Sequence, residues 1–394
     1  MAEKTVLVLV LVLAALVFAD QAFVGLNGNK TDLVLNPPAG GQVVVDGVAF
    51  RSLVERLDKL ETQVGTLAQQ LGGNHCTTIA DTTTITGLSG DYKWLGGVVA
   101  GNKIFGVPYN SPSVLIIDQT TNAADTTTIA SLSGAGKWAG GVLAGKGKIY
   151  CIPHNSLSVL IIDPATSTVD ITTISDLSGG NKWYGGVLAG NGKIYGIPLY
   201  STSVLVIDPA IDTADTTTIT GLSGTEKWAG GVLASNGRIY GIPYMSTSVL
   251  IIDPATSTAD TTIITGLSGS NKWVGGVLAG NNKIYGIPFS STSVLIIDPT
   301  TNTADTTAIV GLSGTIKWLG GVLAGGKIYG IPDSSPSMLI IDPTTNTADT
   351  TTITGFPSGT NKWRDGVLAG NGKIYGLPCF ASSVLIIQQA CDVF

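Results

Sequence analysis

Few side chains in this sequence are of the types that carry out catalysis. Only two histidines occur, His75 and His154, so a multi-histidine metal site cannot be built. The Gly-x-Ser-x-Gly turn that presents a nucleophilic serine is absent. From residue 76 onward Glu226 is the only glutamate, and Arg238 and Arg364 are the only arginines. We therefore predict that the protein is not an enzyme and needs no metal or cofactor, and a hydrolase or oxidoreductase is only a third hypothesis.

A different set of residues could bind a ligand. The chain is built from near-identical repeats, and one set of turns carries side chains that change from repeat to repeat. Many of these are aromatic, which suits contacts with protein or carbohydrate. The alternative is drift in loops, with the aromatics filling gaps between repeats. The predicted binding residues are Tyr109, His154, Tyr184, Tyr200, Tyr244, Phe289, Asp333, Arg364, Asp365 and Phe380.

The elements that must position these residues are seven copies of one segment. Each copy reads Lys-Trp-x-Gly-Gly-Val-Leu-Ala, then Lys-Ile-Tyr-Gly-Ile-Pro, then Ser-Val-Leu-Ile-Ile-Asp, with small variations. The tryptophans recur every 44 or 45 residues and are all the tryptophans in the chain. A fixed period of this length, made of short β segments, predicts an all-β, seven-bladed β-propeller.

Each repeat divides into four expected strands. The first holds paired glycines, as the crowded strand nearest a propeller axis requires. The second and third are apolar and should be covered by neighbouring blades. The fourth is expected at Asp-Thr-Thr-Thr-Ile-Thr, a β-branched outer strand. The lysines before Trp and at the start of the second strand are expected to solvate hairpin ends.

The repeat resembles the YVTN-type β-propeller repeat. The likeness lies in Ser-Val-Leu-Ile-Ile-Asp-Pro-Ala-Thr-Ser-Thr at 248–258, in the following Trp-x-Gly, and in Asn-Gly-Lys-Ile-Tyr. It covers all seven repeats, although the strand that gives that family its name reads Ile-Tyr-Gly-Ile-Pro here. The resemblance implies seven-bladed propellers of extracellular and surface-layer proteins.

The order of the repeats predicts how the ring closes. A fourth-strand segment at 82–86 precedes the first blade, and the last blade has none after residues 384–387. The early segment should complete the last blade and remove both open edges. Cys76 and Cys391 flank this seam, where the loop of the other blades is missing, so we predict a disulfide between them. Cys151 and Cys379 are expected to be buried or free thiols.

The first 75 residues do not belong to the repeat. Residues 1–19 resemble a secretory signal or hydrophobic anchor, and 20–49 predict a short β oligomerisation element in which two strands flank Pro-Pro-Ala-Gly-Gly. Residues 50–73 carry a heptad pattern that predicts a coiled coil, or a single amphipathic helix packed on the propeller. Asn29 lies in a glycosylation sequon. The predicted oligomerisation residues are Phe50, Leu53, Leu57, Leu60, Val64, Leu67 and Leu71.

Charge and composition limit the kinds of partner that the protein is expected to bind. The 394-residue chain has a net charge of −6 and no basic patch, which argues against nucleic acid. After signal cleavage no membrane association is expected. We expect a secreted structural protein, a subunit of an extracellular fibre, filament or coat that self-associates through residues 20–73, with a neck resembling that of trimeric fibre proteins. The alternative is an adhesive head on an oligomeric stalk that binds glycan or protein with its variable face.

Overall fold

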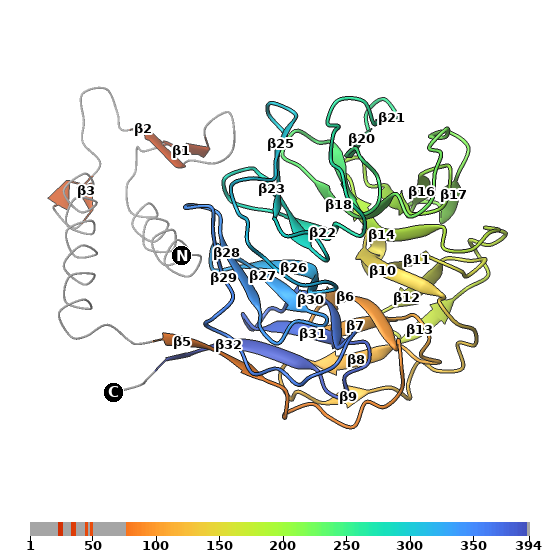
Figure 1. Ribbon diagram of the computed structural model, residues 1–394, viewed down its shortest axis with the longest axis horizontal. Coiled ribbons are helices and arrows are strands. Elements are labelled where there is room, and N and C mark those ends of the chain that lie inside the picture. Colours follow the sequence, from red (N-terminus) through yellow and green to blue (C-terminus); the bar gives the residue numbers. More distant parts are fainter. Residues whose placement is uncertain (1–22, 27–32, 37–43, 46–47, 50–75, 392–394) are drawn as a thin grey trace. The chain divides into compact units, whose positions relative to one another are not determined.

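The computed structural model describes residues 23–26, 33–36, 44–45, 48–49 and 76–391. Within residues 76–391 lie seven four-stranded antiparallel sheets, the blades of a propeller (Figure 1). The prediction of an all-β, seven-bladed propeller is therefore confirmed. The described residues contain one 3-10 turn, η1 (Gly145–Gly147), and no α-helix.

The blades follow one another along the chain, each with its strands in sequence order. Blade 1 comprises β6 (Trp94–Ala100), β7 (Lys103–Pro108), β8 (Leu115–Asp118) and β9 (Ala124–Asp125). Blade 2 comprises β10 (Trp138–Leu143), β11 (Ile149–Pro153), β12 (Leu160–Asp163) and β13 (Thr168–Asp170). Blade 3 comprises β14 (Trp183–Leu188), β15 (Ile194–Pro198), β16 (Leu205–Asp208) and β17 (Thr213–Asp215).

The remaining blades repeat the pattern. Blade 4 comprises β18 (Trp228–Leu233), β19 (Ile239–Pro243), β20 (Leu250–Asp253) and β21 (Thr258–Asp260). Blade 5 comprises β22 (Trp273–Leu278), β23 (Ile284–Pro288), β24 (Leu295–Asp298) and β25 (Thr303–Asp305). Blade 6 comprises β26 (Trp318–Ala324), β27 (Lys327–Pro332), β28 (Leu339–Asp342) and β29 (Thr347–Asp349). Blade 7 comprises β30 (Trp363–Leu368), β31 (Ile374–Pro378), β32 (Leu385–Cys391) and β5 (Cys76–Asp81).

The first strand of each blade faces the axis of the ring and contacts the first strands on both sides, with β30 beside β6. A bulge interrupts each of them, as between Trp228 and Gly231 in β18. At the bulge Gly230 has φ +82°, and a Cβ there would lie 3.0 Å from Cα of Gly275 in the next blade. The paired glycines of blades 1 to 6 thus let the first strands meet at close range.

Apolar layers join neighbouring blades. Between blades 4 and 5, Tyr240 and Ile242 pack against Trp273, Ile284 and Leu295. The same layer joins blade 7 to blade 1. Consecutive apolar residues in the second and third strands are explained by this arrangement, because each blade is covered on both faces.

The fourth strands differ from the prediction. They consist of Thr-Ala-Asp or an equivalent, and the Asp-Thr-Thr-Thr-Ile-Thr segment leaves the strand as a bend. The reason is local hydrogen bonding: the Asp170 carboxylate accepts bonds from the backbone N–H of Thr172 at 2.7 Å and of Thr173 at 3.1 Å. An aspartate that captures its own backbone favours a turn over a ladder.

Blade 7 is completed by an N-terminal strand, but not by the predicted residues. β5 at Cys76–Asp81 pairs beside β32, and the two strands lie side by side in Figure 1. The predicted strand at 82–86 was wrong in position, since residues 82–85 form the same bend as in the other blades. Ile85 O still accepts a hydrogen bond from Val384 N at 3.0 Å, as Ile264 O does from Val249 N in blade 4.

Two hairpins are described in the N-terminal region. β1 (Phe23–Leu26) pairs with β2 (Leu33–Asn36), and β3 (Val44–Val45) pairs with β4 (Val48–Ala49). The strands β2 and β3 stand on the two sides of Pro-Pro-Ala-Gly-Gly in the sequence, where two strands were expected, and each pairs with another strand, β2 with β1 and β3 with β4. The signal segment 1–19, the helix at 50–73 with its heptad residues, and Asn29 lie outside the described residues. Among the helices described, none has the length and apolar content to cross a membrane.

Candidate functional site

The variable turns are held in place by a ring of buried lysines. Lys227, directly before Trp228, donates from Nζ to the carbonyls of Leu199, Ser201 and Gly224 at 3.0, 3.0 and 2.9 Å. Trp228 Nε1 donates to Ser248 O at 2.7 Å. The expectation that these lysines solvate hairpin ends was wrong: the lysine before Trp is at most 4% exposed in every blade.

Each lysine contacts the turn after the Ile-Pro of the preceding blade. In blade 4 the backbone N–H of Lys227 also donates to Leu199 O, at 3.0 Å. Burial lowers the pKa of Lys227 to about 8, so the ammonium that supplies three donors is still the main form at neutral pH. Since these bonds go to backbone carbonyls, the side chain of the turn residue is free to differ between blades.

Those side chains surround a pocket of about 290 Å³ on this face of the ring. Tyr109 and His154 have ring centroids 5.4 Å apart, and Tyr244 and Phe289 lie 6.0 Å apart. An apolar floor lies between them, formed by Leu199, Ala229, Val274, Phe289 and Leu319. The pocket is lined by Tyr109, His154, Asn181, Tyr184, Leu199, Tyr200, Glu226, Ala229, Tyr244, Val274, Phe289, Leu319 and Arg364.

One buried ion pair supplies the charge at the pocket wall. Arg364 Nε donates to Asp333 Oδ2 at 2.8 Å, and the Asp333 side chain is completely buried. Arg364 Nη2 donates to Asn361 Oδ1 at 2.6 Å, and its guanidinium lies 5.4 Å from the Tyr92 ring centroid. These contacts fix the plane of the guanidinium, and its edge on the pocket presents donors to a ligand.

His154 has an unpaired buried nitrogen. The residue is 5% exposed, and its Nδ1 has no hydrogen-bond partner among the described residues. Burial lowers the pKa of His154 to about 4, so the imidazole is neutral at physiological pH. A neutral imidazole that lines a pocket can accept or donate one hydrogen bond there, depending on its tautomer.

A smaller cavity of about 90 Å³ lies on the axis of the ring, lined by the first glycine of each bulge. In blade 7 this glycine is replaced by Asp365, which keeps the left-handed backbone with φ 67°. Its Oδ1 accepts a bond from Gly366 N at 2.9 Å. Burial raises the pKa of Asp365 to about 6. Tyr184, Val274 and Leu319 line both cavities, so the axial carboxylate lies below the floor of the larger one.

The structure brings most of the predicted binding residues together. Seven of the ten line the pocket: Tyr109, His154, Tyr184, Tyr200, Tyr244, Phe289 and Arg364. Asp333 holds Arg364, Asp365 lies in the axial cavity, and Phe380 stacks edge-on against Tyr92 at 4.4 Å. Cys151 and Cys379 are buried free thiols, as predicted.

Among the lining residues that sequence reasoning missed, two are polar, Glu226 and Asn181; the others form the apolar floor. Glu226 is the only glutamate of the repeats, and that rarity could have singled it out. Tyr200 and Glu226 both line the pocket, and burial together with the neighbouring Glu226 raises the pKa of the Tyr200 hydroxyl. Asn181 gave no signal, because asparagine occupies the same place in other repeats.

No protein-family model matches this chain, and no curated protein matches it by sequence. Its fold is similar to several solved structures. A streptogramin B lyase aligns with a TM-score of 0.66 and 10% identity over 79% of this chain and 98% of its own. A catalytically inactive virginiamycin B lyase from Staphylococcus aureus with quinupristin aligns with a TM-score of 0.64 and 9% identity over 79% and 99%. The extracellular domain of a hybrid two-component system from B. thetaiotaomicron aligns at 0.60 and 12% over 79% and 42%.

These comparisons correct two predictions. Because its repeats hold few residues of catalytic types, the protein was predicted not to be an enzyme. Its predicted role was that of a subunit of a fibre, filament or coat. The solved structures of similar fold include lyases, which are enzymes, and the extracellular domain of a two-component system. The inference from a regular repeat to a structural role was wrong because a propeller places its chemistry in a few loop residues, which composition does not reveal.

Proposed function

We propose that the protein binds a small organic molecule in the pocket of the variable face. The observation that carries the proposal is the contrast between a repeated backbone and unlike side chains at one place: the turns are pinned identically, yet their side chains enclose about 290 Å³. The aromatic wall and apolar floor fit a ring, while Arg364 and Glu226 provide one charge of each sign.

Ligand binding can be tested by calorimetry on the full chain with two probes, 4-hydroxybenzoate and quinupristin, the latter because it accompanies a structure of similar fold. We expect Tyr109→Ala to weaken binding at least about tenfold, since it removes one aromatic wall. Ile211→Ala is the matched control, because Ile211 is 68% exposed on a loop between third and fourth strands. Equal affinity of both variants for every ligand that binds would contradict the assignment of the pocket.

A second function, an elimination reaction on the bound ligand, is favoured by the unpaired Nδ1 of His154. A neutral imidazole can accept the proton that such a reaction removes from carbon, and the similar structures include lyases. Product formation at unchanged total mass would be followed by chromatography and mass spectrometry. We expect His154→Gln to lose turnover at least about a hundredfold while keeping the ligand; full turnover in this variant would exclude His154 as the proton acceptor.

We also propose that the protein is secreted and self-associates through residues 20–73. The apolar run before Ala19, the heptads at 50–73 and the likeness to extracellular receptor domains support this. The YVTN-type character of the repeat is part of the same proposal. Light scattering of the full chain and of a Leu57→Asp/Leu60→Asp variant tests self-association, which should fall to a monomer in the variant.

A further inference from the structure

On the face opposite the variable turns, a tyrosine and an asparagine of one blade donate hydrogen bonds to a loop of the next blade. We call these two contacts the latch. Between blades 4 and 5 the hydroxyl of Tyr240 donates to Asn302 Oδ1 at 2.8 Å, and Asn236 Nδ2 donates to Pro299 O at 3.0 Å. Asn302 and Pro299 belong to the loop between the third and fourth strands of blade 5. The hydroxyls of Tyr150, Tyr285 and Tyr375 make the corresponding bond to Asp212, Asn346 and Asn122.

A charge pair accompanies the latch in several blades. In blades 3, 4 and 5 the residue directly before the second strand is basic, and it pairs with the aspartate that ends the third strand. The pairs are Lys193 with Asp208 at 3.5 Å, Arg238 with Asp253 at 3.2 Å, and Lys283 with Asp298 at 3.9 Å.

At the junction of blades 6 and 7 both features are missing. β32 does not turn after the position of the usual aspartate, which is Gln388, but continues to Cys391. Blade 6 has Gly325-Gly326 where other blades carry the latch asparagine. Within the part of the chain that the structure describes, the Tyr329 hydroxyl and the Lys373 ammonium therefore have no partner.

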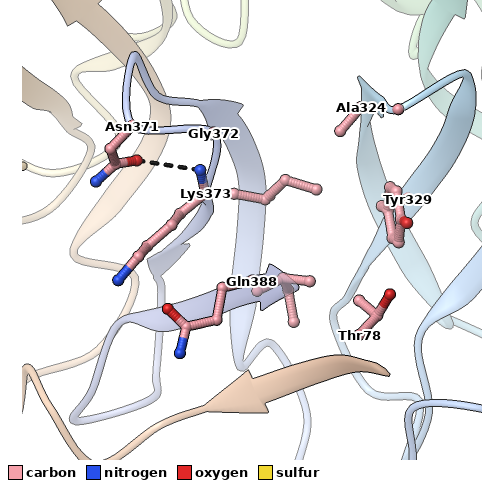
Figure 2. A pocket seen from close by; sticks show the side chains of 10 residues that line it. Thr78, Ala324, Tyr329, Asn371, Gly372, Lys373 and Gln388 are labelled. Atoms are coloured by element: carbon pink, nitrogen blue, oxygen red, sulfur yellow. Dashed lines mark hydrogen bonds between the residues drawn. The ribbon is translucent and has the colours of Figure 1, made fainter. Parts of the chain in front are cut away.

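The result is a pocket of about 300 Å³ at the seam. Figure 2 shows Thr78, Tyr329, Lys373 and Gln388 around it, with Asn371 Oδ1 accepting a bond from Lys373 N. Lys373 and Tyr329, which lie on opposite sides of the pocket in Figure 2, bring an ammonium and a phenol hydroxyl as hydrogen-bond donors, and no acidic group is among the residues that line the pocket. Carboxylate is the chemistry that fits them.

We propose that this seam pocket binds an acidic, extended peptide segment supplied by another chain. At the junctions of blades 4 with 5 and 5 with 6, the corresponding space is filled by a loop of sequence Asp-Pro-x-x-Asn, whose carbonyl and side-chain oxygens accept bonds from tyrosine and asparagine. A peptide docked at the seam would give Tyr329 an acceptor and Lys373 a carboxylate. This inference goes beyond the proposed function, since it concerns the opposite face and other residues.

The loop that the seam lacks is itself the probe. A fluorescent peptide Asp-Pro-Thr-Thr-Asn-Thr-Ala-Asp, the sequence of residues 298–305, is titrated with the full chain and followed by anisotropy. We expect saturable binding that Lys373→Met weakens at least about tenfold and Tyr329→Phe about threefold. Lys193→Met is the matched control: it removes the same side chain in blade 3, where Asp208 is the partner, and should leave the affinity unchanged.

Three outcomes would overturn the proposal. The first is that binding of the peptide does not saturate. The second is that Lys373→Met and Lys193→Met bind the peptide equally well. The third is that acetate displaces the peptide, while a peptide with both aspartates replaced by asparagine does not bind. The last result would show that the pocket takes any carboxylate and has no preference for a peptide. Circular dichroism melts of each variant confirm that a lost signal is not lost folding.

Discussion

Blades 4 and 7 are built from nearly the same sequence and have the same backbone, yet they differ in what they carry. Blade 4 is continuous in the chain, has glycine at the axial bulge and alanine after its tryptophan. Blade 7 borrows β5 for its outer strand and replaces the corresponding Ala-Gly by Arg364-Asp365. The pocket's only arginine, the axial carboxylate and the seam pocket all belong to, or border, the blade where the ring closes.

The repeated residues therefore maintain the ring, and the departures from the repeat line its two pockets and its axial cavity. Four experiments test this contrast between blades 4 and 7, in order of decreasing change in stability.

The seam lacks the covalent loop that joins the outer strands of blade 4, so a disulfide between Cys76 and Cys391 should replace it. In blade 4, Ile251 pairs with Asp260. If blade 7 keeps this register, with Ile386 opposite Asp81, its continuation along β32 and β5 would place residues 391 and 76 opposite each other. Closing a loop that contains nearly the whole propeller stabilises by about 5 kcal/mol on the chain-entropy model. Peptide mapping with and without reductant, and denaturant melts of Cys76→Ser, test it; two free thiols in protein produced in an oxidising compartment would refute the bridge.

Arg364→Met should destabilise the fold by about 4 kcal/mol, because it leaves the Asp333 carboxylate buried without its cation. The matched control is Arg238→Met in blade 4. The Arg238 side chain is 40% exposed, so loss of its pair with Asp253 should cost about 0.5 kcal/mol. Urea unfolding measures both changes. Equal losses would mean that the blade 7 pair is no different from a surface pair.

Gly230→Ala should cost about 3 kcal/mol, since it combines a positive φ with a Cβ 3.0 Å from Gly275 Cα. Gly237→Ala in the same blade has a similar φ of +78° but no atom within 4 Å, and should cost about 1 kcal/mol. Asp365→Gly makes blade 7 like blade 4 and should stabilise by about 1 kcal/mol. A destabilised Asp365→Gly variant would show that the axial carboxylate supports the ring.

His154 of blade 2 occupies the position that Tyr244 has in blade 4. Replacing His154 with tyrosine should remove a pH dependence of the protein's stability. Its pKa of about 4 in the folded state lies below the ordinary value of 6.5, so the unfolded chain binds more protons between these values. Stability should thus fall by about 2 kcal/mol between pH 7 and pH 5. His154→Tyr should lose this slope. The aspartates that accept bonds from threonine affect stability only at lower pH, since the pKa of Asp170 is lowered to about 2, first by Thr173.

The fold was predictable because its signal is repeated sevenfold: tryptophan spacing, paired glycines and apolar strands all indicate one blade. The candidate pocket was reachable too, because only side chains such as Tyr109 and Tyr244 vary at an otherwise fixed turn. Other features depend on tertiary contacts that no single repeat reveals. The burial of Lys227 requires carbonyls from the preceding blade, and the shift of β5 to Cys76–Asp81 reflects competition between Asp81 and the ladder for the backbone of Thr83. The expected fibre role could not be derived from the repeat, because the same fold also occurs in lyases.

The lysine ring has a consequence for engineering. Because the Lys227 ammonium binds main-chain oxygens of the adjoining turn, the side chain displayed there can change without loss of this anchor. The seven equivalent sites already hold leucine, tyrosine, phenylalanine, histidine, aspartate and cysteine. The chain is thus a scaffold for a combinatorial library in which six of these codons are randomised, while Asp333 is kept as the partner of the buried Arg364.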